Sequence, residues 1–346
     1  MTSVRVGAGK PYDVLIGSGI SSEIPKKIKE FSKGNRALIV SDDNVFPLHG
    51  EKLCSELRKN GIETKTFVFE NGEKSKNINT LSDILEFAAV NLFSRDSIFV
   101  SLGGGVTGDI TGLAASLYMR GVPYIQVPTT LLAMTDSSVG GKTAVDLRAG
   151  KNLMGAFYQP ACVVCDTCYL DTLPEKIFRD GMADVIKYGM IYDKDLFDSL
   201  YDKNFDREKV IEKCVSLKAS CVALDEFDRG ERRKLNFGHT VGHAMELLSN
   251  YGITHGQAVS AGMCRITEAS AKKGLCGYSC FEKLRGLLSL YGLETECRYS
   301  ADELMTGIKR DKKRENNRVA LVIPREIGKA EIMEMNDKKI KEFLDC

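Results

Sequence analysis

Short apolar runs and helical patterns alternate along the first half of the chain. Runs rich in Val, Ile, Phe and Tyr are typical of buried strands. We expect such strands at residues 12–17, 36–42, 64–70, 96–105 and 122–130. Between them, apolar residues recur at helical spacing with Gly or Ser at the ends, which predicts helices at 21–34, 47–61 and 77–93. This alternation predicts a mostly parallel sheet with crossover helices.

The second half has a different pattern from about Leu173 onward. Long stretches with helical spacing predict helices at 175–191, 207–225, 240–250, 256–274 and 282–292. Strand character returns at 318–324 and in 329–335. The fold class expected is therefore an α/β, Rossmann-like nucleotide-binding domain (1–170) followed by a mainly α-helical domain (171–346). No low-complexity linker separates them, so we expect a tight connection near 165–173 and a shared cleft.

Composition places the chain among ordinary globular proteins. It has 346 residues, of which 43% are hydrophobic and 27% charged. A formal net charge of +1 gives no long-range attraction to nucleic acid or to an anionic membrane, so neither is an expected partner. No stretch approaches the ~18 consecutive apolar residues of a membrane helix. The amino terminus lacks a secretory pattern, and eleven cysteines is an odd number, so we expect a cytoplasmic protein with free thiols.

One run of cysteines could be read as part of an iron–sulfur pattern. Cys162, Cys165 and Cys168 follow at intervals of three. The segment is rich in Val and Tyr and predicts a strand, on which odd intervals point to opposite faces. We therefore expect ordinary buried cysteines.

A glycine-rich segment follows the strand expected at 96–105. Residues 103–108 fit the spacing G-x-G-x-x-G, which lets backbone N–H groups approach a diphosphate closely. A simple glycine-rich turn would look the same. Downstream come hydroxyl, carboxylate, lysine and amide groups suited to phosphate binding: Thr129, Thr130, Asp136, Lys142, Lys151 and Asn152. A solvated loop remains the alternative.

Three of the four histidines lie within seventeen positions, at His239, His243 and His255. On a helix, His239 and His243 share a face, and Glu246 joins it. Two histidines on one helix turn can hold zinc, but Thr240 stands where a zinc protease has its glutamate. Spacing alone leaves open whether each histidine is a ligand or a bystander.

Two further groups of charged residues are candidates for a site. Asp184 and Lys187 are three apart on one helix face, which suits either a buried site or a surface ion pair. Before the histidine helix lies a polar cluster of Lys218, Asp225, Asp228, Arg232 and Asn236. A merely charged helix end would look similar.

Taken together, these motifs resemble the 3-dehydroquinate synthase family of the sugar-phosphate cyclase superfamily. The resemblance covers nearly the whole chain. It runs through "NGEKSK", "LGGGVTGDITGLAAS", "MRGVPYIQVPTTLLAMTDSSVGGKTAV", "GKNLMGAF", "LNFGHTVGHAMEL", "HGQAV" and "RDKKRENNRVALVIPREIG". Several of these motifs are long and specific, and they follow the family's order.

The resemblance implies an NAD- and metal-dependent lyase of the shikimate pathway, which leads to chorismate and the aromatic amino acids. Its substrate would be 3-deoxy-D-arabino-heptulosonate 7-phosphate, and its products 3-dehydroquinate and phosphate. The implied steps are oxidation of one carbinol, loss of phosphate, reduction of the same carbon, ring opening and aldol closure. The family is usually a homodimer with NAD and zinc or cobalt between its two domains, and the sequence does not decide between the metals.

The resemblance also implies residue roles. The metal ligands would be Asp184, His239 and His255, and His243 would contact substrate and help to move protons. Substrate would be held by Asp136, Lys142, Asn152, Lys187, Lys218, Asp228, Arg232, Asn236 and Lys312, with Arg120 contributed across a dimer. Lys313 is the alternative to Lys312. NAD would be bound by Asp42, Asn44, Glu73, Lys76, Gly104, Gly105, Val106, Gly108, Asp109, Thr129, Thr130, Lys142, Lys151 and Thr172.

Two positions depart from the family pattern. Asp184 and Asp228 stand where the family usually has glutamate, and each loses a methylene, on the order of 1.5 Å of reach. Since metal–ligand distances tolerate only about 0.2 Å, the helix must sit closer or a water must intervene. Another sugar-phosphate cyclase, a metal-dependent polyol dehydrogenase of the same fold and a non-catalytic binding protein remain alternatives.

Overall fold

The computed structural model describes residues 1–250, 252–309, 314–315 and 318–345. The chain forms two compact units. Unit 1 contains residues 1–174 and 207–227, and unit 2 contains residues 175–206 and 228–346. Unit 1 therefore draws on residues from both sides of the boundary predicted at 170/171.

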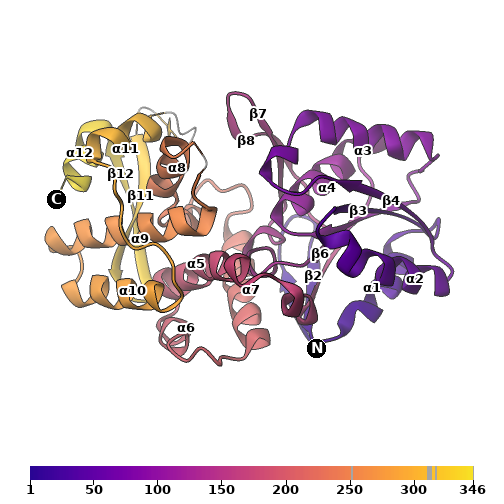
Figure 1. Ribbon diagram of the computed structural model, residues 1–346, viewed down its shortest axis with the longest axis horizontal. Helices are drawn as coiled ribbons and strands as arrows, with labels where there is room; N and C mark the ends of the chain where they lie inside the picture. Colours follow the sequence, from indigo (N-terminus) through magenta and orange to yellow (C-terminus); the bar gives the residue numbers. More distant parts are fainter. Residues whose placement is uncertain (251, 310–313, 316–317, 346) are drawn as a thin grey trace. The chain divides into compact units, whose positions relative to one another are not determined.

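Unit 1 is built on a seven-stranded sheet of order β1-β2-β9-β6-β5-β3-β4. Figure 1 labels β2, β3, β4 and β6 of this sheet. All neighbouring strands are parallel except β1 and β2. The strands are β1 (Thr2–Val6), β2 (Tyr12–Gly17), β3 (Arg36–Asp42), β4 (Glu63–Phe69), β5 (Ile98–Gly103), β6 (Tyr124–Pro128) and β9 (Cys162–Asp166). Every residue of β5, β6 and β9 is buried, as expected for parallel strands covered on both faces. The predicted strands at 12–17, 36–42, 64–70, 96–105 and 122–130 are confirmed.

Helices and one hairpin complete unit 1. They are η1 (Ile20–Glu23), α1 (Ile24–Phe31), η2 (Phe46–Gly50), α2 (Glu51–Lys59), η3 (Glu73–Ser75), α3 (Ile78–Val90), α4 (Gly105–Leu117), η4 (Tyr118–Arg120), η5 (Ala133–Ser137) and η6 (Thr167–Thr172). The hairpin pairs β7 (Lys142–Leu147) with β8 (Gly150–Phe157) and was not predicted. Helix α7 (Arg207–Leu224) also belongs here, because it packs against β1, β2 and η5.

Unit 2 is mainly helical, as predicted. Its helices are α5 (Glu175–Tyr192), α6 (Lys194–Ser199), η7 (Glu231–Asn236), α8 (His239–Leu248), α9 (His255–Lys272), α10 (Tyr278–Leu290), α11 (Ala301–Ile308) and α12 (Asp337–Leu344). A small antiparallel sheet joins β10 (Arg314–Glu315), β11 (Arg318–Glu326) and β12 (Lys329–Asn336). Helix α9 is central, since it packs against α5, α8, α10, α12 and β11 (Figure 1). None of the helices in the described ranges is both long and apolar enough to span a lipid bilayer.

Asp166 ties the end of β9 to the segment after β2. Its carboxylate accepts hydrogen bonds from the backbone N–H groups of Gly19, Ser21 and Cys168, and from the Ser21 hydroxyl. Burial acts to raise the pKa of Asp166, but these hydrogen bonds outweigh it and lower the pKa below its ordinary value of 3.8. Asp166 is therefore a charged clasp between two parallel strands.

The same turn corrects one expectation about the cysteines. Cys162 and Cys165 are buried on β9, as predicted, but Cys168 is exposed. Strand β9 ends at Asp166, whose side chain accepts from the backbone N–H of Cys168 and so starts the 3-10 helix η6. The third thiol thereby leaves the strand and lies 3.1 Å from the Ser18 hydroxyl.

Candidate metal and nucleotide sites

Three imidazoles of unit 2 lie together at the starts of two helices. His239 opens α8 and His255 opens α9, while His243 lies one turn along α8. The ring centroids of His239 and His255 are 5.1 Å apart, and those of His239 and His243 are 5.5 Å apart. The centroids of His243 and His255 are separated by 6.1 Å. The fold thus brings together three side chains that were candidates on sequence alone.

Glycines allow the backbones of α8 and α9 to approach this closely. A Cβ at Gly262 would overlap the carbonyl oxygen of Gly238, and a Cβ at Gly242 would lie 3.1 Å from the backbone of Ala258. Gly238 itself precedes α8 with a φ of +79°, a left-handed conformation that favours glycine. Side chains at these positions would push the helices apart, and with them the imidazoles that they carry.

Helix α5 carries Asp184 and Lys187, both almost fully buried. The Lys187 Nζ lies 2.5 Å from Asp184 Oδ1. A buried pair is the arrangement that suits a site, so the alternative of a surface ion pair is wrong for these residues. The other carboxylate oxygen, Asp184 Oδ2, is also buried and has no hydrogen-bond partner among the described residues. An unpaired buried carboxylate oxygen is costly unless it binds a ligand.

A second close contact joins α5 to the start of α9. The Thr254 hydroxyl donates to the carboxylate of Asp180, one turn before Asp184. A Cβ at Gly256 would overlap the backbone carbonyl oxygen of Asp180. Since His255 lies between Thr254 and Gly256, this packing holds its backbone tightly against α5.

The donor atoms in this region fit a divalent cation. The Nδ1 atom of His239 lies 3.0 Å from the Phe237 carbonyl oxygen, which assigns the proton to Nδ1 and leaves the Nε2 lone pair free. Burial, followed by the nearby charge of Lys187, holds the pKa of His239 well below its ordinary value, so the imidazole is neutral, as a ligand must be. Together with the unpaired oxygen of Asp184, these features suit the predicted ligand set.

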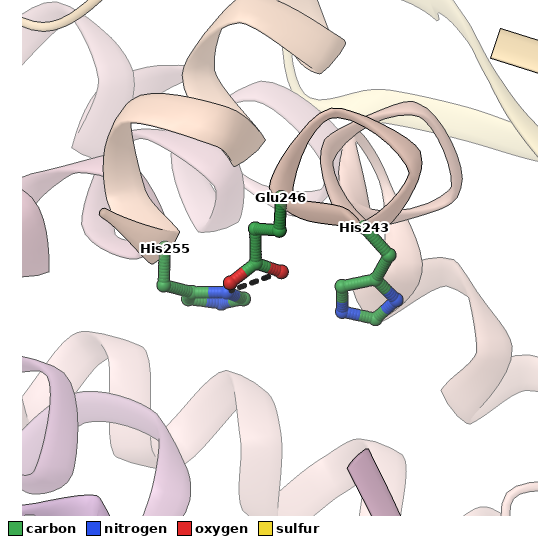
Figure 2. Close-up of side chains that lie close together, drawn as sticks. All are labelled: His243, Glu246 and His255. Carbon is green, nitrogen blue, oxygen red and sulfur yellow. Dashed lines mark ion pairs between the residues drawn. The ribbon is translucent and has the colours of Figure 1, made fainter. Parts of the chain in front are cut away.

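Glu246 adds a second buried carboxylate beside the histidines. Within the described part of the chain, the ligand atoms of His243, Glu246 and His255 all lie within 4.8 Å of one another, and Figure 2 shows their side chains gathered from α8 and α9. Glu246 Oε2 lies 3.7 Å from His255 Nδ1. Burial acts to lower the pKa of His255, but Glu246 and Asp184 outweigh it and raise that pKa. These carboxylates therefore stabilise positive charge beside the histidines. The sequence placed Glu246 on the histidine face of the helix but gave it no role.

Further predicted residues of unit 2 precede α8. Arg232 is almost fully buried on η7, and Asn236 ends that helix half-buried. Asp228 has a φ of +60° in the preceding loop. Lys312, and the alternative Lys313, lie outside the described residues.

In unit 1, two predicted substrate residues form an ion pair. Lys218 of α7 donates to the backbone oxygen of Asp136 at 2.7 Å and also to its carboxylate. Asp136 is on η5, so the contact also fixes α7 against the η5 segment of the same unit. The ammonium group of Lys218 is thereby held at one place although its stem is flexible.

A second cluster brings cofactor and substrate predictions together. Lys76 Nζ lies 2.7 Å from Asp109 Oδ2 and donates to Asn152 Oδ1 at 2.6 Å. Lys151 Nζ is 3.8 Å from Glu73 Oε1 at its edge. Burial raises the pKa of Asp109, opposed by the charge of Lys76. The structure thus gathers residues that lie far apart in the sequence.

The glycine-rich segment is mostly helix rather than loop. Strand β5 ends at Gly103, Gly104 caps α4 without a side chain, and the helix begins at Gly105, so Val106 and Gly108 lie in its first turns. A Cβ at Gly108 would be 2.6 Å from Gln126 Oε1, so this glycine allows α4 to pack against the sheet. Because no side chain caps this amino terminus, the first backbone N–H groups of α4 can bind an anionic ligand.

Other cofactor predictions surround this helix end. Asp42 Oδ1 accepts from the N–H groups of Asn44 and Val45 at 3.0 Å, and Thr107 donates to Asp42 Oδ2. Thr129 Oγ1 is buried and has no hydrogen-bond partner among the described residues. These groups lie at the carboxyl ends of β3, β5 and β6, where open α/β sheets bind ligands. The residues present fit a dinucleotide.

Three predicted residues lie elsewhere on unit 1. Thr172 ends η6, and its hydroxyl lies 2.8 Å from His49 Nε2, a contact that spacing did not predict. Lys142 begins β7 and is exposed. Arg120 ends η4, is exposed and has a φ of +67°.

Comparison with solved structures gives the class of protein. A 2-deoxy-scyllo-inosose synthase complexed with carbaglucose-6-phosphate, NAD+ and Co2+ aligns with a TM-score of 0.87, 26% identity and 99% of both chains. The 2-epi-5-epi-valiolone synthase of Streptomyces hygroscopicus subsp. jinggangensis 5008, with NAD+ and Zn2+ bound, aligns with a TM-score of 0.87 and 26% identity over 96% of this chain and 95% of that chain. The fold is that of the sugar-phosphate cyclases. An iron-containing alcohol dehydrogenase from Thermococcus thioreducens, 14% identical with a TM-score of 0.68, shares the fold alone.

Sequence comparisons give the family. Residues 66–180 match the family model "3-dehydroquinate synthase N-terminal", and residues 181–314 match "3-dehydroquinate synthase C-terminal". A 3-dehydroquinate synthase from Clostridium botulinum is 42% identical over 94% of this chain and 96% of its own length. One from Clostridium acetobutylicum is 42% identical over 96% of both. The chain belongs to the 3-dehydroquinate synthase family.

Proposed function

We propose that this chain converts 3-deoxy-D-arabino-heptulosonate 7-phosphate into 3-dehydroquinate and phosphate, a step of the shikimate pathway towards chorismate and the aromatic amino acids. Membership of the family over nearly the full chain supports this activity. The observation that carries it is the cluster of three imidazoles in unit 2, together with the buried carboxylate of Asp184, whose charge helps to raise the pKa of His255. The alternatives are another cyclase or a polyol dehydrogenase. The cyclase and dehydrogenase structures that share the fold are 26% and 14% identical to this chain, below the 42% of the 3-dehydroquinate synthases.

Asp184, His239 and His255 would hold a divalent metal, Zn2+ or Co2+, and the residues around β3, β5 and β6 would hold NAD. When bound, the metal stabilises negative charge on a substrate oxygen, and NAD accepts and returns a hydride. The unpaired Oδ2 of Asp184 and the free Nε2 of His239 are the available ligand atoms. His243 lies beside both other imidazoles and exchanges protons with the substrate.

The remaining residues bind and orient the substrate. Arg232 and Lys218 suit the carboxylate, because a guanidinium can bind a carboxylate through two parallel hydrogen bonds. Lys142, Asn152, Asn236, Lys312 and Arg120 suit the phosphate. Asp136 keeps the Lys218 ammonium in place, and Lys187 would contact a hydroxyl group from beside Asp184.

The test supplies the purified protein with NAD, zinc and the heptulosonate phosphate. Phosphate release and absorbance at 340 nm are then followed together, with chelator-treated protein and an assay without NAD as controls. We expect phosphate release without net NADH, because the cofactor returns to its starting state. Accumulating NADH would indicate a dehydrogenase, phosphate release only from another sugar phosphate would indicate another cyclase, and bound ligands without chemistry would leave a binding protein.

We also propose that the working form is a homodimer in the cytoplasm. Leu117 at the end of α4 and Met119 on η4 are exposed apolar side chains, and both Met119 and Arg120 have a positive φ. Apolar exposure beside strained backbone supports an interface there. The ten cysteines in the described ranges are free thiols, which supports a reducing compartment. Light scattering on the eluted protein measures the mass, and a monomer at micromolar concentration would contradict the dimer.

A further inference from the structure

Three residues of unit 1 form a closed ring of hydrogen bonds. The N–H of Asp146 donates to the Lys76 carbonyl oxygen at 2.7 Å. Lys76 Nζ donates to Asn152 Oδ1 at 2.6 Å. The N–H of Asn152 donates to Asp146 Oδ1 at 2.7 Å. Each member donates once and accepts once, so moving one residue disturbs the other two.

An irregularity in the β7–β8 hairpin makes Asp146 available for this ring. The pairing of the two strands shifts between Val145 and Leu147, and Asp146 falls at the shift. It bridges to Asn77 instead of to a residue of β8. Its N–H and carboxylate are therefore free to bond Lys76 and Asn152 rather than to continue the ladder.

Asn152 needs such support because its φ is +54°. This left-handed conformation is uncommon for residues other than glycine, although asparagine tolerates it better than most. A hydrogen bond from its N–H to a carboxylate is charge-assisted and therefore strong. Asp146 thus stabilises the backbone conformation that determines where the Asn152 side chain lies.

The ring also fixes which end of the Asn152 amide is available. Because Oδ1 accepts from Lys76, the Nδ2 group is the end left to meet another partner. An NH2 group donates only, so it suits a phosphate oxygen. Lys76 in turn pairs with Asp109 at 2.7 Å, so the same ring connects the predicted cofactor residues with the predicted phosphate contact.

We propose that Asp146 is a positioning residue, which sets the Asn152 amide with its donor towards the substrate phosphate and holds Lys76 in the cofactor site. The proposal rests on the proposed function for the identity of the ligands. Neither sequence spacing nor the family motifs had assigned Asp146 a role.

The test compares Asp146→Ala with Asp146→Asn. Alanine removes the acceptor for the Asn152 N–H, whereas asparagine keeps an acceptor oxygen at the same place. Asp202→Ala is the matched control, since Asp202 also accepts a backbone N–H in a turn, from Asn204 at 2.9 Å in unit 2. Three quantities are measured: the KM for the heptulosonate phosphate, the Kd for NAD by titration calorimetry, and hydrogen exchange in the peptide containing Asn152.

We expect Asp146→Ala to raise KM and the NAD Kd about tenfold and to speed exchange at Asn152, since a hydrogen bond to a charged group is lost. Asp146→Asn should restore most of both values, and Asp202→Ala should match the wild type. If Asp146→Ala behaves like Asp202→Ala, the proposal is wrong.

A double-mutant cycle tests whether Asp146 acts through Asn152. Asn152→Gly keeps the left-handed turn without strain and removes the amide, so it remains usable even if Asp146→Ala fails to fold. Its KM should rise about tenfold, and adding Asp146→Ala should change KM little further. Additive effects would overturn the proposal. Should the wild type bind NAD but release no phosphate, the proposed function fails, while NAD affinity and exchange at Asn152 still decide the role of Asp146.

Discussion

Among single residues, Asp184 is the predicted metal ligand whose role a substitution can test most directly. Its carboxylate is fully buried, with one oxygen held by Lys187 and the other without a partner in the described structure. Burying an unsatisfied carboxylate oxygen destabilises a protein, so a residue of this kind persists where it binds something. The shorter side chain compared with the family's glutamate makes the geometry around it more demanding.

Asp184→Asn should lower the affinity for zinc by at least about 100-fold, because a ligand loses its charge while its volume is kept. Metal affinity is measured by competition with a chromophoric chelator, and thermal unfolding without metal checks the fold. Asp198→Ala is the control, since the carboxylate of Asp198 forms an exposed ion pair with Lys194 on α6. A variant that retains zinc as tightly as the wild type would remove Asp184 from the ligand set.

The residues of the site were predictable to the extent that their motifs are contiguous. Lys76, Asp109 and Asn152 were named from separate motifs, and the structure brings them within hydrogen-bond reach. Asp146 was missed because its role comes from a shift in strand pairing, which side-chain type does not reveal. Glu246 was seen on the right helix face, but its neighbour His255 lies on another helix.

At the scale of elements, glycine determines how closely the helices of the site approach. The overlap that a Cβ at Gly256 would make with the Asp180 carbonyl means that α5 and α9 touch through backbone atoms. A closer helix was one of the two explanations for how the shorter Asp184 could reach a metal ion bound by His255, the other being an intervening water. The contact from Thr254 to Asp180 reinforces it.

Gly256→Ala should lower the free energy of unfolding by about 1–3 kcal/mol, because the added methyl overpacks a backbone contact. Zinc affinity should fall with it. Gly286→Ala on α10 is the control, since a Cβ there meets nothing within 4 Å, and it should raise stability by about 0.5–1 kcal/mol through helix propensity. Chemical denaturation measures both variants, and equal stability would refute the close-packing argument.

Elements with unbroken apolar runs were the ones predicted well. Strands β3, β5 and β6 are buried along nearly their whole length, so their sequences carry no competing signal. Strand β1 was missed because it lies at the sheet edge and is mostly exposed. The β7–β8 hairpin was not predicted, because its strands are rich in glycine and lysine and do not alternate regularly between exposed and buried residues.

At the scale of the whole molecule, stability in acid depends on the Asp166 clasp. The pKa of Asp166 is lower in the folded protein than its ordinary value of 3.8, so the carboxylate binds protons more readily once the chain unfolds. The stabilisation is therefore complete above the unfolded pKa. It is lost as the pH falls from about 3.8 through the lower folded pKa.

Asp166→Asn should lower the free energy of unfolding by about 2 kcal/mol at pH 7, since hydrogen bonds to a charged acceptor are weakened. The difference from the wild type should shrink as the pH falls below about 4. Urea denaturation at several pH values measures it. Asp13→Asn, which removes the exposed pair with Arg5, should change stability by no more than about 0.5 kcal/mol. A difference that stays constant with pH would show that charge is not the cause.

The passage of the chain between its two units has a consequence for biosynthesis. It crosses at 174/175, returns at 206/207 and leaves again at 227/228. The sheet of unit 1 is fully translated by residue 166, yet α7, which covers β1, β2 and η5, has not then been made. During translation, α5 and α6 of unit 2 are therefore synthesised before α7, the helix that packs against the rest of unit 1. The edge of the nascent sheet at β1 and β2 therefore lacks this packing partner until α7 emerges.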